Sequence, residues 1–302
     1  MKLTVDGRTA YAYTGGKPFD PALPCVVFIH GALNDHSVWT LLARWFAHHG
    51  HAVLAVDLPG HMRSEGPALA SVEAMADWTL ALLDAAGVQR AELVGHSLGS
   101  LVALEAAGRA PARVTRLAMV GSCYPMAVPK ALLELSLADP LAAIDRVVMF
   151  SHSTLAPKPS YPGPGVWLRG AARQLGRQVL RHQGDERLFH TDFSACDRYA
   201  GGLEAAARVR CPAHLILARE DQMTPTRAAT DFAAALKARV QCPVQLILGR
   251  DDQMTPPRAT RDIAAALKAE VAYLGAGHNL MQEAPDGLLA ALRGAAPAPA
   301  AR

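Results

Sequence analysis

The sequence of 302 residues predicts an α/β protein with a mostly parallel β-sheet flanked by helices. Short apolar runs, which are typical of buried strands, alternate with helical patterns as far as residue 120, and this alternation indicates βαβ units. Several of the runs end in glycine-containing turns. The composition, 51% hydrophobic and 19% charged, is that of a globular chain with a substantial core. Together these observations favour one large α/β domain.

The first 120 residues contain the clearest elements. Residues 1–13 predict a hairpin that turns at Asp6-Gly7. Largely apolar runs predict strands that are buried on both faces. These predicted strands are residues 24–29, 52–56, 93–94 and 114–120. Helices are expected between them, at about residues 37–49, at about residues 71–86 with Ser71 near the start as a capping residue, and directly after residue 99.

The alternation stops between residues 122 and 208. Helical pieces continue there, but a Pro/Gly cluster at residues 157–165 interrupts them. A long insertion that begins at the carboxyl end of a strand lies where open α/β sheets bind ligands. We therefore expect an inserted helical cap. The expected organisation is a first core segment (1–122), the helical cap (123–208) and a second core segment (209–302).

The second core segment contains an internal repeat. Residues 211–240 recur as residues 242–271 with a constant offset, 242 − 211 = 31. Each copy predicts one strand, one acidic turn and one helix, so the fold contains a duplicated strand-helix unit. Two copies are too few for a solenoid, and a tandem duplication within one domain is the simpler account. The copies supply two equivalent acids, Asp221 and Asp252.

After the repeat, residues 271–274 predict a last strand and residues 283–292 a final helix. The glycine-rich turn between them carries His278. The turn leaves this histidine ring free to reach other strand ends, which makes it a candidate catalytic base.

A Gly-x-Ser-x-Gly pattern at residues 95–99 places Ser97 between a strand and a helix. Side chains at Gly95 or Gly99 would collide with neighbouring backbone if the chain turns sharply around the serine. In such a turn the hydroxyl is pushed out above the sheet and can act as a nucleophile. The alternative is an ordinary helix start in which Ser97 is only the N-cap.

Five motifs at the ends of successive strands carry a family resemblance. They are His30-Gly31, Asp57-Leu58-Pro59-Gly60-His61, Gly95-His96-Ser97-Leu98-Gly99, Gly249-Arg250-Asp251-Asp252 and Gly275-Ala276-Gly277-His278. With these motifs the chain resembles the α/β-hydrolase fold family, in its form with a helical cap, over nearly its whole length. The resemblance implies a catalytic triad in the chain order Ser, Asp, His.

The resemblance implies a role for each matching residue. Ser97 would attack an acyl carbonyl, His278 would act as base and then acid, and Asp252 would orient His278, with Asp221 as the alternative acid. A serine hydroxyl needs this help because it is a poor nucleophile at neutral pH. The oxyanion donors would be the backbone N–H groups of Leu98 and Ala32.

Two considerations favour Asp252 over Asp221. One helix joins Asp252 to the strand before His278, which is the connection that the family fold implies. If the first copy held the sheet position, the second copy would be looped out or would push the histidine strand outward by about 4.8 Å. We expect the surplus copy at the sheet edge or the surface, or exchanged between protomers.

Other residues near these motifs have structural interpretations. His30, His61 and His96 are expected to organise turns through hydrogen bonds. Met62 departs from the family pattern, because glycine is common at this position, and could alter the backbone of its loop.

The predicted function is that of a serine hydrolase that cleaves carboxylic esters with a modest apolar group through an acyl-enzyme. No cofactor and no metal are expected. The same triad also serves carbon–carbon bond hydrolases, acyltransferases and perhydrolases. An alternative of another class is a non-catalytic ligand-binding homologue, in which the duplication has displaced the acid.

Composition and termini limit the partners. The net charge of +3, with scattered basic residues, does not favour nucleic acid as a partner. The five cysteines are expected to be reduced, no run is long enough to span a membrane, and the N-terminus lacks the apolar segment of a secretion signal. We therefore expect a cytoplasmic monomer or a homodimer, and the repeat offers an element that a homodimer could swap.

Overall fold

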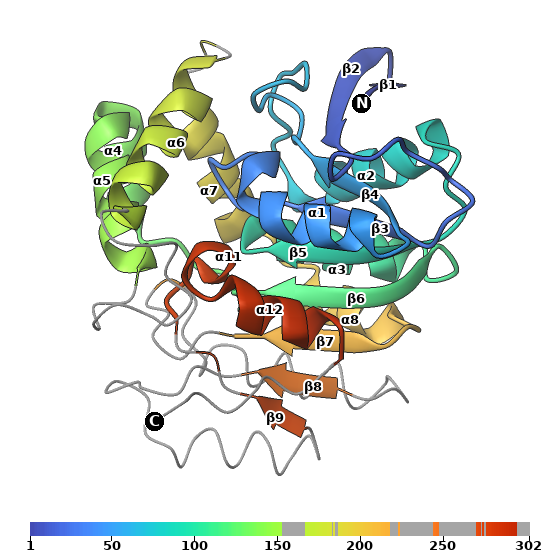
Figure 1. Ribbon diagram of the computed structural model, residues 1–302. Helices are drawn as coiled ribbons and strands as arrows, with labels where there is room; N and C mark the ends of the chain where they lie inside the picture. Colours follow the sequence, from blue (N-terminus) through green and yellow to red (C-terminus); the bar gives the residue numbers. More distant parts are fainter. Residues whose placement is uncertain are drawn as a thin grey trace.

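A nine-stranded sheet organises the portion of the chain that the computed structural model describes, which is residues 1–152, 167–182, 184, 187–217, 223, 244–247, 270–272, 274 and 276–294. The order is β1-β2-β4-β3-β5-β6-β7-β8-β9 (Figure 1). The strands are β1 (Lys2–Val5), β2 (Arg8–Tyr13), β3 (Cys25–Ile29), β4 (Ala52–Val56), β5 (Ala91–His96), β6 (Val114–Val120), β7 (Ala213–Ile216), β8 (Val244–Ile247) and β9 (Glu270–Ala272).

The sheet is mostly parallel, as the sequence predicts. Strands β1 and β2 pair antiparallel with Val5 opposite Arg8, and β2 pairs antiparallel with β4. Every other pair in the described sheet is parallel. Asp6 and Gly7 turn the hairpin with φ values of 51° and 75°. Positive φ at both central residues is the mark of a type I′ turn, which explains why Asp-Gly stands there.

Helices cover both faces of the sheet. The helices before the insertion are η1 (His36–Trp39), α1 (Thr40–His48), α2 (Val72–Ala85) and α3 (Leu98–Arg109). Those after β6 are α4 (Lys130–Ala138), α5 (Pro140–Ser151), α6 (Leu168–His182), α7 (Leu188–Arg198), α8 (Gly202–Arg208), α11 (Leu280–Glu283) and α12 (Pro285–Leu292). Helices α1 and α12 pack together on one face, and α3 packs against both α2 and α8 on the other (Figure 1).

Strand β3 shows why its apolar run is continuous. All five of its residues are buried, and successive side chains enter opposite cores. Phe28 packs against Trp39, with ring centroids 5.1 Å apart, in the core under α1 and α12. Val27 and Ile29 lie in the core under α2 and α3. The period of two along a doubly covered strand therefore leaves no position for a polar residue.

The inserted helices, here α4–α7, have a small core of their own. It contains Ile144 and Val148 of α5, Val179 of α6 and Phe189 of α7, and Leu33 from the loop after β3 belongs to it. Figure 1 shows these helices together at one end of the sheet. By contrast, α8 packs on α3. The insertion is thus seated on a loop at the carboxyl end of a central strand.

Both copies of the repeat contribute a strand to the sheet. Strand β7 of the first copy pairs in parallel with β8 of the second, and β8 pairs with β9. The register places Ala213 opposite Val244 and Ile216 opposite Ile247, so equivalent positions of the two copies are neighbours. The expectation that one copy lies at the edge or on the surface is wrong for these strands, because both lie inside the sheet. Asp221 and Asp252 lie outside the described residues.

Several boundaries predicted from the sequence are confirmed. Strand β4 and strand β6 have the predicted ends, and Ser71 caps α2 by accepting a hydrogen bond from the Ala74 N–H. The last strand begins one residue earlier than predicted. The final helix is divided at Ala284, because Pro285 cannot continue the hydrogen bonding of α11.

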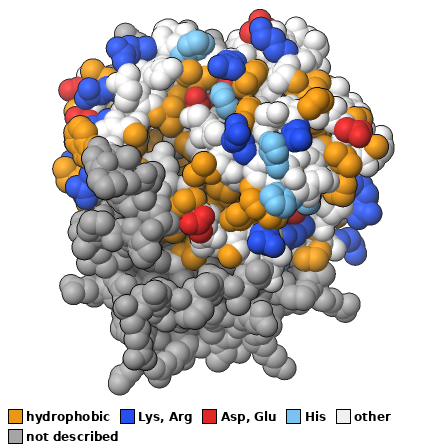
Figure 2. Space-filling view, in the orientation of Figure 1, with side chains coloured by type: hydrophobic (Ala, Val, Ile, Leu, Met, Phe, Trp, Pro, Cys, Tyr) orange, Lys and Arg blue, Asp and Glu red, His pale blue; other side chains and the backbone are white. Residues whose placement is uncertain are grey.

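The described surface mixes side chains of every kind. Figure 2 shows basic, acidic and apolar side chains interspersed over the described portion of one face. None of the helices within the described residues is both long and apolar enough to cross a membrane. The four described cysteines, Cys25, Cys123, Cys196 and Cys211, are buried.

Candidate active site

Ser97 stands at the apex of a strained turn. Its backbone has φ 51° and ψ −120°, between the end of β5 and the start of α3. A Cβ at Gly95 would lie 2.0 Å from the Gly99 carbonyl oxygen, and one at Gly99 would lie 2.4 Å from the Ile29 carbonyl oxygen. Both glycines are therefore required by close backbone approach. Ser97 occupies the N-cap position but its side chain makes no capping hydrogen bond, so capping does not explain the serine.

The loop after β3 lies directly against this turn. A Cβ at Gly31 would lie 3.1 Å from the Ser97 Cβ, which shows how close the loop comes. Within the loop, the Leu33 N–H donates to Asp192 Oδ2 (2.8 Å) and the Asn34 N–H donates to the Gly31 carbonyl (3.3 Å). The Ala32 N–H has no acceptor among the described residues and so is available to a ligand.

His278 lies above the ends of β5 and β6. His96 Nε2 donates to the His278 carbonyl oxygen (3.0 Å), and the two rings have centroids 4.7 Å apart. A Cβ at Gly121 would lie 3.3 Å from His278 Nδ1, so the missing side chain gives the imidazole its place. On the other side, the Asn279 N–H donates to the Ser151 carbonyl of α5 (3.2 Å). The histidine loop is thus held both by the elbow and by an inserted helix.

Three histidines have the structural contacts expected of them. His96 fixes the His278 loop as described. His30 Nδ1–H donates to the Gly31 carbonyl (2.8 Å), and its Nε2 accepts from the Leu58 N–H (3.0 Å).

His61 donates from Nδ1 to the Pro59 carbonyl and from Nε2 to Asp192 Oδ2 (3.0 Å). Because both nitrogens of His61 face acceptors, the geometry favours the doubly protonated ring.

Burial and charge give the two neighbouring rings opposite pKa shifts. Burial, reinforced by the charge of His61, lowers the pKa of His30 to about 4. Burial also opposes the charged form of His61, but the carboxylate of Asp192 outweighs it and the pKa of His61 is raised. Asp192 is fully buried on α7, so a neutral His30 lies beside a buried His61–Asp192 ion pair.

Met62 keeps the backbone that a glycine would favour. Its φ is 39°, in the left-handed region, so the presence of methionine does not move this loop into an ordinary conformation. The Met62 side chain is buried in the core of the inserted helices. Burial of the thioether offsets the backbone strain.

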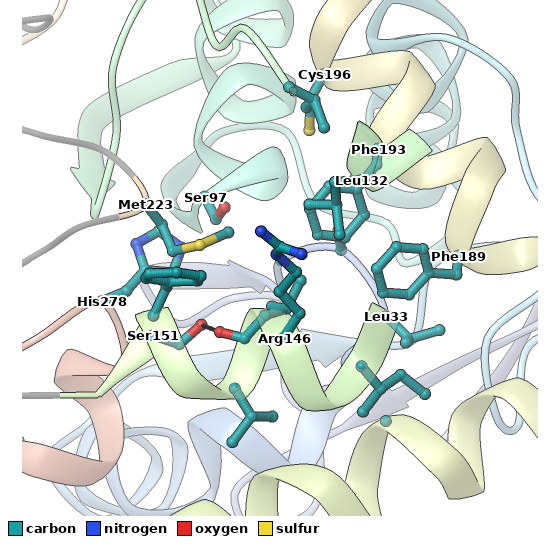
Figure 3. Close-up of a pocket in the computed structure, with 18 of the residues that line it drawn as sticks. Leu33, Ser97, Leu132, Arg146, Ser151, Phe189, Phe193, Cys196, Met223 and His278 are labelled. Carbon is teal, nitrogen blue, oxygen red and sulfur yellow. Dashed lines mark hydrogen bonds between the residues drawn. The ribbon is translucent and has the colours of Figure 1, made fainter. Parts of the chain in front are cut away.

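A cavity of about 480 Å³ joins these elements. Ser97 and His278 line it (Figure 3), as do Ala32 and residues of α5, α6 and α7. Met223, from the first copy of the repeat, also lines it. Its described wall is largely apolar and includes Leu33, Met126, Val128, Leu132, Ile144, Val147, Val148, Phe150, Phe189 and Phe193. Such a chamber suits a small molecule with an apolar portion.

Leu98, the other oxyanion donor predicted from the sequence, lies directly after Ser97. It is the first residue of α3, and the first amides of a helix have no partner within the helix. Its N–H is therefore free of the helix ladder immediately beside Ser97. The two candidate acids, Asp252 and Asp221, are outside the described residues.

Three residues at or beside the cavity carry no recognisable motif and were missed from the sequence. Asp192 binds the loop after β3, Ser151 holds the histidine loop through its carbonyl, and Arg146 lines the cavity from α5. Each belongs to an inserted helix whose position on the core follows from long-range packing. No local pattern reveals such contacts.

Asp35, His36 and Asp57 form the one group within the described residues whose donor atoms are close enough to hold a metal ion, within 4.8 Å of one another. Asp57 already accepts from the His36 N–H, from His36 Nδ1 and from the Arg63 N–H. Asp35 accepts from Ser37. These bonds explain the cluster as a scaffold for the loop after β4.

Comparison with known proteins agrees with this geometry. The profile of the alpha/beta hydrolase fold matches residues 24–285. The chain belongs to the α/β-hydrolase fold family. This hydrolase-type family accounts for the parallel sheet, the serine at the strand-to-helix turn and the histidine after the last strand.

Individual members of the family show how far the likeness extends. A 119-residue segment is 39% identical to the dihydrolipoyllysine-residue acetyltransferase component of the acetoin cleaving system of Cupriavidus necator, covering 38% of this α/β-hydrolase chain and 30% of that protein. The chain spans about a third of the length of the first curated relatives it matches.

Solved structures match over almost the full length. An esterase from Exiguobacterium antarcticum has a TM-score of 0.71 at 15% identity, covering 97% of this chain and 98% of that one. The enol-lactonase from Burkholderia xenovorans LB400 has a TM-score of 0.68 at 19% identity, with 97% and 98% covered. At such identities the likeness establishes the fold.

Proposed function

We propose that this α/β-hydrolase is a serine hydrolase that cleaves carboxylic esters with a modest apolar group. One observation carries the proposal: Ser97, at the apex of a strained elbow, lines the same largely apolar cavity as His278 and Ala32. The inserted helices α4–α7 act as the cap that closes this cavity.

The proposed reaction uses each residue in turn. Ser97 Oγ attacks the ester carbonyl while His278 takes its proton, and His278 then returns that proton to the leaving alcohol. Water hydrolyses the acyl-enzyme by the same route. The developing oxyanion is bound by the N–H groups of Leu98 and Ala32, each of which stabilises it by about 3 kcal/mol. The assignment of Ala32 is supported because Leu33 and Asn34 have their N–H groups engaged elsewhere.

The acid that orients His278 comes, in this proposal, from the repeat. Connection along the chain favours Asp252, but two observations support Asp221. Strand β7 of the first copy is the direct neighbour of β6, beneath His278, whereas β8 lies one strand farther out. Met223, two residues after Asp221 in the sequence, lines the cavity. We therefore assign the role to Asp221, with Asp252 as the alternative.

Hydrolysis of p-nitrophenyl acetate, butyrate and octanoate by the wild type and by Ser97→Ala tests the function. We expect turnover by the wild type and a loss of about 10⁴-fold or more in Ser97→Ala, as for other serine nucleophiles. A fluorophosphonate should label the wild type once, at Ser97, by mass spectrometry. Ser136→Ala is the control, since its hydroxyl bonds the Leu133 carbonyl within α4. Hydrolysis unchanged in Ser97→Ala would refute the proposal, and ligand binding without turnover would favour a non-catalytic homologue.

Acyl transfer is the second candidate. The acyl-enzyme is common to hydrolysis and transfer, and the relative from Cupriavidus necator is named as an acetyltransferase component. Addition of a small alcohol to the assay separates the two reactions. An ester product in excess of free acid would make transfer the main reaction, and carbon–carbon cleavage or perhydrolysis would be detected with their own substrates.

A further inference from the structure

Arg146 gives the cavity its one permanent charge among the described residues that line it. The other described lining residues are apolar, small or uncharged apart from the two histidines, His96 and His278. Figure 3 shows the Arg146 side chain extending from α5 into the group of lining residues that includes Ser97. Arg146 is exposed and so keeps its charge at the cavity, where an ester with two apolar ends would make no use of it.

The neighbouring acid does not neutralise this charge. Asp145 is bound by two other guanidinium groups, those of Arg173 (3.0 Å) and Arg177 (3.5 Å) on α6. Within the described residues, Arg146 has no hydrogen bond and no ion pair. The stretch that follows α5 in the sequence, residues 153–166, contains no aspartate and no glutamate. Among the described residues, none of the five donors of the guanidinium is engaged.

The position of Arg146 on its helix is that of a cavity wall. Val147, Phe150 and Ser151 of the same helix also line the cavity, and residues four apart lie on one helix face. Asp145, the preceding residue, contacts α6 instead. The buried side of α5 carries Ile144 and Val148, whereas Arg146 and Phe150 are exposed, so Arg146 lies at the rim of the cavity.

We propose that Arg146 binds a carboxylate carried by the substrate, so that the preferred esters are monoesters of dicarboxylic acids. The planar guanidinium matches a carboxylate through two parallel hydrogen bonds, a geometry that lysine cannot offer. The apolar wall would hold the methylene chain between the carboxylate and the scissile ester. This inference rests on the proposed function, since Ser97 is taken as the attacking group.

Two ester substrates whose acyl groups have the same number of carbons show the effect of the substrate carboxylate alone. Mono-p-nitrophenyl glutarate carries a carboxylate, and p-nitrophenyl valerate carries a methyl group in its place. We expect the wild type to prefer the glutarate in kcat/KM, and Arg146→Met to lower that preference about tenfold, chiefly through KM for the anionic ester. Arg146→Lys should retain some of the preference. The preference should also weaken with added NaCl, because Arg146 is exposed enough to be screened.

Arg181→Met is the matched control. Arg181 is an exposed arginine of α6 that does not line the cavity, and its Nε donates to the Arg177 carbonyl. Its loss changes the net charge by the same amount, so general electrostatic steering would affect both variants equally. Equal changes of substrate preference in Arg146→Met and Arg181→Met, or no change in Arg146→Met, would overturn the proposal.

Calorimetry measures binding of a carboxylate at Arg146 independently of ester hydrolysis at Ser97. Ser97→Ala and Ser97→Ala/Arg146→Met are titrated with monomethyl glutarate and with dimethyl glutarate. Tighter binding of the monoanion that depends on Arg146 supports the subsite even if no ester is hydrolysed, in which case only the proposed function fails. If the wild type hydrolyses esters but monomethyl glutarate binds equally well with and without Arg146, the proposed carboxylate subsite is wrong and the proposed function still holds.

Discussion

Ser97 has a backbone conformation that most residues adopt only under constraint, and two missing side chains provide the constraint. Gly95 approaches the first turn of α3, and Gly99 approaches the end of β3. The neighbours in both cases are backbone atoms of buried elements, which cannot move aside as a flexible side chain would. The strain at Ser97 is therefore maintained by packing on both sides of the elbow.

Gly99→Ala should disrupt this arrangement. The added methyl group would meet the Ile29 carbonyl oxygen at 2.4 Å and the His30 carbonyl oxygen at 2.5 Å. We expect the free energy of unfolding to fall by about 3 kcal/mol or more, at the upper end of the range for overpacking, and the proposed hydrolysis of esters to fall with it. Thermal denaturation measures the change. Gly201→Ala, where the nearest atom would be 3.4 Å away, should remain close to the wild type, and equal stability of both variants would contradict this account.

At the scale of elements, one carboxylate joins the insertion to the core. Asp192 of α7 accepts hydrogen bonds from the loop after β3 and from His61 in the loop after β4. Because the first of these loops also presents the Ala32 N–H, helix α7 fixes the position of a proposed oxyanion donor. Stability and alignment of the site therefore depend on one buried ion pair.

The pH dependence of stability tests this ion pair. The pKa of His61 is raised in the folded protein, so its contribution is fully present below the unfolded value near 6.5 and is lost as the pH rises through the folded value. We expect the difference in melting temperature between the wild type and Asp192→Asn to be largest at about pH 6 and to shrink at more alkaline pH.

His30 contributes the opposite slope between pH 6.5 and about 4, because its folded pKa is lowered. This slope lies below pH 6.5, so the loss of the His61 contribution is followed from pH 6.5 upward. Asp197→Asn, on the same helix and bonded to the Val128 N–H, should show no such pH dependence. A difference between wild type and Asp192→Asn that does not vary with pH would contradict a charged His61.

At the scale of elements, the sequence could predict some features of the fold and the site but not others. Strand β4 was predicted to the residue because burial on both faces leaves a continuous apolar run, and β6 was predicted from its largely apolar run although Thr115 is exposed. The elbow was predictable because its geometry requires glycine at fixed positions. Asp192 and Arg146 were not, since their roles arise where a helix far away in the sequence packs against the core. The place of the second repeat strand was also misjudged, because a pattern of apolar residues does not give the strand order.

At the scale of the whole molecule, the repeat widens the sheet without interrupting it. Strands β7, β8 and β9 run parallel, and each is paired with the next. The histidine loop nevertheless reaches back to the elbow, where His96 binds it. The site therefore tolerates an additional strand between β7 and the strand that leads to His278.

Comparison of Asp221→Asn with Asp252→Asn tests which copy serves the site. We expect Asp221→Asn to lower kcat about 10⁴-fold, as loss of the orienting acid does, and Asp252→Asn to have little effect. Stopped assays with p-nitrophenyl butyrate measure both, with melting temperatures to exclude unfolding. The reverse pattern would return the role to Asp252, and equal losses would show that both copies are needed.

The in-register pairing of the two copies has a genetic consequence. Since each residue of β7 lies beside its own duplicate in β8, a recombination event that gains or drops one unit of 31 residues leaves every remaining side chain on its original face. The domain can therefore gain or lose whole repeat units while buried side chains stay buried and exposed side chains stay exposed. The length of the repeat unit sets the size of such changes. Variants of this protein that carry one copy or three copies of the unit would be the first to look for.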